Sequence, residues 1–143
     1  MKYLFDSSVL IAAIVEPHPM HTRAFPWLKK AKTGSFDWVV ASHSITEIYS
    51  VLTTLPLSPK ISPAAAWRLI YENIPKQIIT SLTTSEYLST IKILSESGLA
   101  GGIVYDALIA KAAQKSKADK ILTFNIKDLK RVWPQGKDNI VSP

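Results

Sequence analysis

Four carboxylates and one amide of this chain fall near the end of the predicted sheet where a site is expected. Asp6 directly follows the first apolar strand, and Glu47 lies about one helical turn after the second. Asn125 and Asp128 follow the last strand, and Asp106 lies in the first turns of the helix that leads into it. Ligands of open parallel sheets bind beyond the carboxyl ends of the strands. We therefore expect these side chains to surround one pocket.

Several carboxylates in one pocket repel each other and stay ionised together only beside a cation. Oxygen ligands without His or Cys favour Mg²⁺ or Mn²⁺ over zinc. Such an ion binds a phosphodiester, stabilises its developing charge and lowers the pKa of a bound water. The cluster therefore predicts metal-dependent phosphodiester chemistry.

Each of these residues also has a purely structural interpretation. Asp6 or Asp128 could cap the helix that follows it, and Glu47 could close an S-x-x-E capping box. Asp106 could complement a helix dipole, and Asn125 could form an Asx turn. One such residue at nearly every expected strand end favours a shared site over five unrelated local roles.

Other kinds of active site lack their signatures. The chain has no cysteine, which excludes thiolate nucleophiles and Cys-ligated zinc. It has no Walker loop and no G-x-G-x-x-G. The three histidines, His18, His21 and His43, are unconvincing as catalysts, because no nucleophile elbow accompanies them.

The bulk properties fit one folded domain, residues 1–143. Hydrophobic residues make up 47% of the chain, and the net charge is +6. A basic surface attracts nucleic acid or an acidic partner. The absence of cysteine fits a reducing compartment. No signal peptide is visible, and the apolar run Val9–Val15 is too short to span a bilayer, so we expect a cytoplasmic protein without a membrane segment.

Strands and helices are predicted to alternate along the chain. The predicted strands are 2–5, 38–41, 77–82 and 120–124. The predicted helices are 9–15, 21–32, 42–55, 64–73, 84–97, 103–117 and 128–132. This order predicts an α/β fold, with a parallel sheet of about four to five strands sandwiched by helices.

Four segments in this order resemble the motifs of the PIN-domain family, in particular of VapC-like toxin ribonucleases. YLFDSSVL at 3–10 is similar to the family's strand ending in D-[TS]-[SN]-V-L. SHSITEIYSVL at 42–52 is similar to its second motif, and YDALIA at 105–110 is the most specific match. LTFNIKDL at 122–129 resembles T-x-N-x-x-D-F, with Leu129 in place of the usual Phe. The resemblance covers residues 3–129.

The resemblance implies a role for each residue of the cluster. Asp6, Glu47, Asp106 and Asp128 would be the catalytic acids around Mg²⁺ or Mn²⁺. The metal ligands would be drawn from Asp6, Asp106, Asp128 and Asn125, and one or two ions would bind. Either Asn125 or Asp128 would be the fourth ligand. Ser8 and Thr123 would support the metal or the phosphate.

The resemblance also implies RNA as substrate, a homodimer, and a cognate antitoxin that covers the active site. Four of the eleven acids would lie in the pocket, which leaves seven against seventeen Lys and Arg elsewhere. Lys111, Lys115 and Lys127 are candidates for RNA contact, although such lysines are ordinarily solvated helix positions.

Two other functions compete with this interpretation. A haloacid-dehalogenase-like phosphatase also has an Asp after its first strand, but it needs a second Asp two residues later, where this chain has Ser8. A catalytically silent PIN fold could serve as an RNA- or protein-binding module. The complete set of acids argues against it.

Overall fold

A five-stranded parallel sheet forms the centre of the molecule. The computed structural model describes residues 1–143. The strand order is β3-β2-β1-β4-β5, and every neighbouring pair is parallel. The strands are β1 Lys2–Phe5, β2 Asp37–Ala41, β3 Ile79–Thr80, β4 Lys120–Leu122 and β5 Ile140–Val141. The predicted α/β class and the parallel sheet are confirmed.

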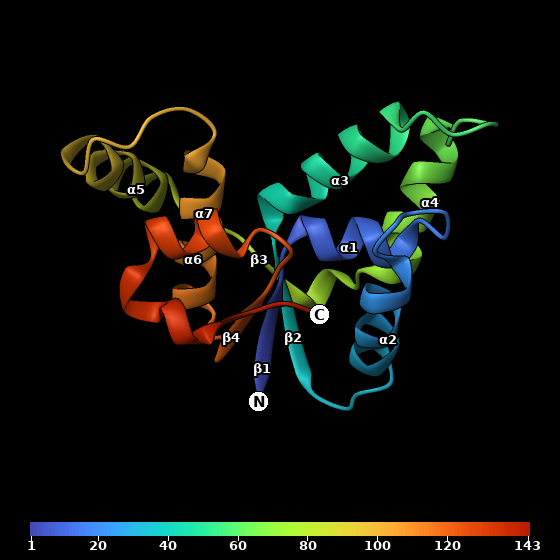
Figure 1. The fold of residues 1–143 in the computed structure, drawn as a ribbon, viewed down its shortest axis with the longest axis horizontal. Helices are drawn as coiled ribbons and strands as arrows, with labels where there is room; N and C mark the ends of the chain where they lie inside the picture. Colours follow the sequence, from blue (N-terminus) through green and yellow to red (C-terminus); the bar gives the residue numbers. More distant parts are fainter.

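Helices cover both faces of this sheet, as Figure 1 shows, with α1 to α4 on one side and α5 to α7 on the other. The α-helices are α1 Ser7–Ile14, α2 His21–Lys32, α3 Ser42–Thr54, α4 Pro63–Asn73, α5 Thr84–Glu96, α6 Ile103–Lys115 and α7 Ile126–Val132. Two short 3-10 helices, η1 Lys76–Ile78 and η2 Pro134–Asn139, precede β3 and β5. None of the helices is both long and apolar enough to cross a membrane.

The two faces of the sheet carry separate hydrophobic cores. Successive side chains of a strand point to opposite faces, so Phe5 joins the core under α1 to α4, while Leu4 joins the core under α6 and α7. Both are completely buried. This double burial explains why the inner half of the central strand is apolar on both faces, up to Asp6 at the edge of the sheet.

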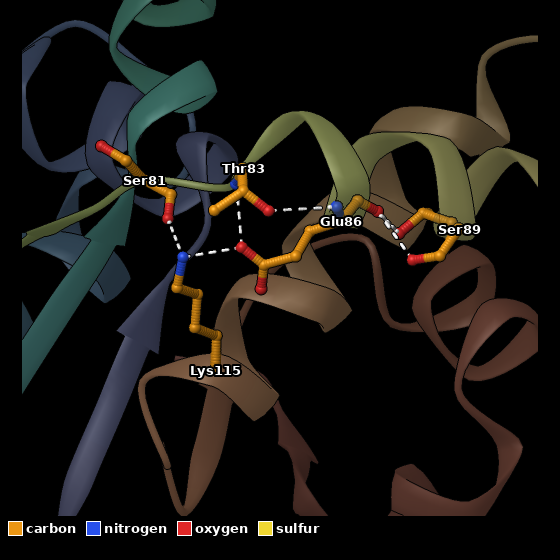
Figure 2. A network of polar contacts seen from close by, with 6 residues as sticks. Ser81, Thr83, Glu86, Ser89 and Lys115 are labelled. Carbon is orange, nitrogen blue, oxygen red and sulfur yellow. Dashed lines mark hydrogen bonds and ion pairs between the residues drawn. The ribbon is translucent and has the colours of Figure 1, made fainter.

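A polar network holds α5 against α6 and is drawn in Figure 2. Thr83 and Glu86 form a reciprocal capping box at the start of α5. The Lys115 ammonium lies 2.7 Å from Glu86 Oε1 and donates to the Ser81 carbonyl at 2.7 Å. The hydrogen bond from Lys115 is the main reason why the pKa of Glu86 falls to about 2. Lys115 therefore has a structural partner.

The predicted strand at 77–82 is shorter than expected. Its first residues form the 3-10 turn Lys76–Ile78, and only Ile79–Thr80 pairs, with Val40 and Ala41 of β2. The strand β5 at the other edge was not among the predicted elements. Its two residues, Ile140–Val141, are too few to give a periodic signal in the sequence.

The last predicted strand, 120–124, ends at Leu122. Two hydroxyl groups accept hydrogen bonds from the backbone amides of Phe124 and Asn125, which therefore do not pair in the sheet. Phe124 N donates to Ser8 Oγ at 3.1 Å, and Asn125 N donates to Thr123 Oγ1 at 2.8 Å. The chain therefore leaves the sheet beside Asp6, and α7 begins at Ile126, two residues before the predicted start.

Candidate active site

A cavity of about 760 Å³ opens beyond the carboxyl ends of the central strands. Its walls come from the start of α1, the first turns of α3, the start of α6 and the segment between β4 and α7. Asp6, Ser8, Glu47, Asp106 and Asn125 all line it. The expected convergence of these side chains from four parts of the chain is therefore confirmed.

Asp128 does not line this cavity, so the expectation that it surrounds the same pocket is wrong. It lies in the first turn of α7 and pairs with Arg131 at 3.7 Å, with 39% of its side chain exposed. Asn125 takes the place nearest to α6, and its Nδ2 donates to Asp106 Oδ1 at 2.9 Å. Asp128 still acts on the pocket through its charge, which contributes to the raised pKa of Asp106.

Asp6 is buried and held on both carboxylate oxygens. Oδ1 accepts from the backbone N–H of Ser7 at 2.8 Å. Oδ2 accepts from Ser8 Oγ at 2.9 Å and from Thr123 Oγ1 at 2.7 Å. Asp6 is also the N-cap of α1, which confirms its structural interpretation; its role as a metal ligand stays a prediction. These contacts fix the direction of the carboxylate, which is what a metal ligand needs.

Glu47 reaches the site through Ser7, a residue that the sequence analysis did not single out. Ser7 Oγ donates to Glu47 Oε1 at 2.9 Å and lies 3.4 Å from Asp6 Oδ1. The bridge joins the carboxylates of Asp6 and Glu47, and its Ser7 and Glu47 are 40 residues apart in the chain. Ser7 is itself buried. The only sequence signal was its place in the D-S-S motif.

The alternative interpretation of Glu47 as a capping-box residue is wrong. The helix α3 begins at Ser42, two residues before the S-x-x-E pattern. Ser44 Oγ is buried without a hydrogen-bond partner and so does not cap the helix. Glu47 therefore stands in the second turn, where its side chain can face the cavity.

Asp106 is a cavity-lining carboxyl group with a clearly raised pKa. Burial and then the charge of Asp6 raise its pKa to about 6, with smaller contributions from Asp128 and Glu47. The hydrogen bond from Asn125 opposes this rise. Like charges crowded in a half-buried pocket favour a bound cation, since a cation removes their repulsion.

The donor set fits a hard divalent cation such as Mg²⁺ or Mn²⁺, because it consists of carboxylates, hydroxyl groups and an amide. No three His, Cys, Asp or Glu side chains already enclose a common point. Mg²⁺ usually keeps several waters and binds through only one or two carboxylates, so a closed cage is not required.

Two ring side chains of the cavity wall were not foreseen as site residues. His43 lines the cavity from α3, and neither ring nitrogen has a hydrogen-bond partner. Burial lowers the pKa of His43, although the charge of Asp6 and the backbone of Tyr105 oppose this shift. Tyr105 lines the cavity from α6 and is 60% exposed. The order of strands and helices cannot predict such residues, because the direction of a helical side chain depends on how the helix is rotated about its axis.

The three lysines proposed for RNA contact lie in different surroundings. Lys111 lines a separate cavity of about 100 Å³ between α5 and α6. Lys115 is bound to Glu86. Lys127 is exposed on α7, two residues after Asn125. Their contacts with RNA stay predictions.

Known proteins share both the sequence pattern and the fold. The family model of the PIN domain matches residues 3–132. Ribonuclease VapC27 of Mycobacterium tuberculosis is 33% identical over 114 residues, which cover 80% of this chain and 78% of that protein. The crystal structure of VapC20 from the same organism, a toxin that cleaves the sarcin–ricin loop, superposes with a TM-score of 0.66 at 13% identity, over 88% of this chain and 92% of that one.

A solved complex has the same fold. The DNA-bound VapBC structure from Salmonella typhimurium superposes with a TM-score of 0.65 at 16% identity and covers 100% of this chain and 97% of that one. The resemblance predicted from four short motifs is thus confirmed over nearly the whole chain. The chain belongs to the PIN domain family.

Proposed function

We propose that this protein is a Mg²⁺-dependent endoribonuclease and the toxin of a toxin–antitoxin pair. The observation that carries the proposal is the convergence of Asp6, Glu47 and Asp106, from three elements, on one cavity. The relative VapC27, at 33% identity, is named a ribonuclease. Membership of the PIN domain family makes the haloacid-dehalogenase-like phosphatase the wrong alternative.

The residues present would divide the work as follows. Asp6 and Asp106 would hold the main ion, Glu47 would complete its shell directly or through water, and Mn²⁺ could replace Mg²⁺. The ion would supply an activated water and stabilise the charge that develops on the phosphodiester. Asn125 donates a hydrogen bond from its side-chain amide nitrogen to Asp106. Its carbonyl oxygen could therefore bind the ion.

Two hydroxyl groups would keep this arrangement rigid. Ser8 and Thr123 both donate to the same oxygen of Asp6, and both also accept from the backbone after β4. They would therefore fix the position of Asn125 relative to Asp6. Asp128, outside the cavity lining, would act through water and through its charge.

The charge balance supports RNA as the substrate. Three of the eleven acids line the cavity, which leaves eight against seventeen Lys and Arg on the rest of the chain. Such a basic surface attracts a polyanion. A cognate antitoxin, a homodimer and a cytoplasmic location belong to the same proposal. A PIN-fold neighbour solved as a VapBC complex supports the antitoxin.

The test is cleavage of a mixed RNA pool by purified protein, with Mg²⁺ and with EDTA, followed by sequencing of the new ends. Asp106→Asn should leave the RNA intact. Glu96→Gln is the matched control, because it removes an exposed carboxylate of α5 and should cleave like the wild type. If the wild type leaves RNA intact in Mg²⁺, the protein is a catalytically silent PIN module.

A further inference from the structure

Tyr105 is an exposed aromatic residue in the wall of the carboxylate cavity. Its side chain is 60% exposed, and its ring takes part in none of the aromatic contacts of the fold. Tyr49 is exposed and has no aromatic partner either, but it lies outside the cavity of the carboxylates. Trp67 and Tyr71 pack on each other, and Phe25 stacks on His21. None of these four lines the cavity of the carboxylates, whereas Tyr105 does.

The position of Tyr105 ties it to the reacting centre. It directly precedes Asp106 in the first turn of α6, and both residues line the same cavity. A nucleobase is joined to its phosphate through a single sugar. A base lying on this ring therefore belongs to a nucleotide beside the phosphodiester that Asp106 would help to bind.

The backbone next to the ring leaves room for such a base. A Cβ atom added at Gly101 or Gly102 would meet no atom within 4 Å. Gly102 lines the same cavity as Tyr105, so an open space adjoins the aromatic residue. A cavity of about 760 Å³ lies within the usual range for organic ligands and is not too small for a nucleotide.

We propose that Tyr105 is a stacking platform for one unpaired nucleobase next to the cleaved phosphodiester. This inference rests on the proposed ribonuclease function and adds the form of its substrate. Every base has a π-face, so stacking on an aromatic side chain binds single strands with little sequence preference. A base inside a duplex has both faces covered. The enzyme therefore selects a single-stranded segment or a loop.

A neutral platform also suits a pocket lined by acids. The carboxylates repel the phosphates of RNA, and this repulsion is removed only when a cation is bound. An aromatic ring attracts a base by stacking, so this attraction does not depend on the metal. Tyr105 would therefore bind the RNA strand whether or not the ion is bound.

The experiment measures kcat/KM on a single-stranded RNA oligonucleotide with one mapped cleavage site. Each nucleotide near that site is replaced in turn by an abasic one. In the wild type, one abasic position should lower kcat/KM roughly 5- to 150-fold, as expected for the loss of one stacked base. Tyr105→Ala and Tyr105→Leu should show the same loss on intact RNA, and no further loss at that position.

Two variants serve as controls. Tyr105→Phe keeps the ring and should behave like the wild type, and Tyr71→Ala removes an exposed aromatic ring of α4 outside the cavity and should change nothing. Tyr105→Leu guards against misfolding, because Leu suits a helix and stays apolar. Wild-type kcat/KM in Tyr105→Ala, or unchanged sensitivity to every abasic position, would overturn the inference and point to a protein contact of this ring.

A binding measurement separates this inference from the proposed function. The protein carrying Asp106→Asn is titrated with oligonucleotides that contain one fluorescent 2-aminopurine. We expect the 2-aminopurine fluorescence to be quenched at a single position, and the quenching to disappear in the double variant that also carries Tyr105→Ala. This result supports the platform even if the wild type cleaves no RNA. Equal quenching with and without Tyr105 refutes it, even if the wild type cleaves.

Discussion

Replacing Asp106 by Asn should make the metal-free protein more stable, although it should abolish the proposed activity. The carboxyl group is half-buried beside Asp6, and its pKa is raised from 3.8 to about 6. Asn removes the charge and keeps the shape. Its carbonyl oxygen can still accept the hydrogen bond that Asn125 now donates to Asp106 Oδ1 at 2.9 Å.

The direction of this change in stability follows from proton binding by Asp106. Between pH 4 and pH 6 the folded state holds the Asp106 proton more often than the unfolded state, so stability falls as pH rises through this window. A rise of this size, to about 6, corresponds at most to about 3 kcal/mol. Because the group is half exposed, solvent screening reduces the effect, and we expect about 1–2 kcal/mol at pH 7.

The assay is urea unfolding of both proteins in EDTA, at pH 4 to 7, followed by the fluorescence of the four Trp residues. The variant should be more stable by this amount at pH 7, and the two curves should approach each other at pH 4. Added Mg²⁺ should stabilise the wild type and not the variant. A variant that is equal to or less stable than the wild type at pH 7 would refute the reasoning and make Asp106 a support of α6.

Three further changes have distinct expected results. Glu47→Gln should lower Mg²⁺-dependent cleavage by more than about 100-fold without changing Tm, because even residues that only hydrogen-bond to metal ligands contribute about 10- to 100-fold. Full activity would reduce the cluster to two acids, Asp6 and Asp106, with Asn125. Ser7→Ala should raise the Mg²⁺ concentration for half-maximal cleavage by about tenfold, since it removes the 2.9 Å bridge to Glu47, and an unchanged requirement would contradict this role. Lys115→Met should lower Tm at pH 7, and this deficit in Tm should shrink as pH falls from 4.5, the ordinary pKa of Glu86, to about 2, its pKa in the folded protein. A wild-type Tm at pH 7 would show that the pair contributes nothing.

The sequence was informative where chemistry depends on the ends of strands. Asp6 follows a strand whose last two residues are completely buried, so its place at the sheet edge could be predicted. Glu47 and Asp106 lie in the first two turns of helices beside the same edge, and their convergence with Asp6 is confirmed. Strand-end placement needs only the order of elements, which apolar patterns indicate well.

The site residues that could not be predicted from the sequence depend on the rotation and the exact start of each helix. A shift of two residues in the start of α7 put Asn125, not Asp128, at the cavity. The S-x-x-E pattern ending at Glu47 was misleading because α3 begins at Ser42, which moves Ser44 away from the capping position. Ser7 was missed because its bridge joins two distant segments that only the fold brings together.

The most direct test of the central claim is RNA cleavage by the wild type and by Asp106→Asn, purified side by side and assayed with Mg²⁺ and with EDTA. We predict that the wild type cuts single-stranded RNA only in Mg²⁺, that Asp106→Asn cuts none, and that both proteins are folded. Cleavage by Asp106→Asn at the wild-type rate, or wild-type cleavage that persists in EDTA, would contradict the claim that this carboxylate cluster is the active site.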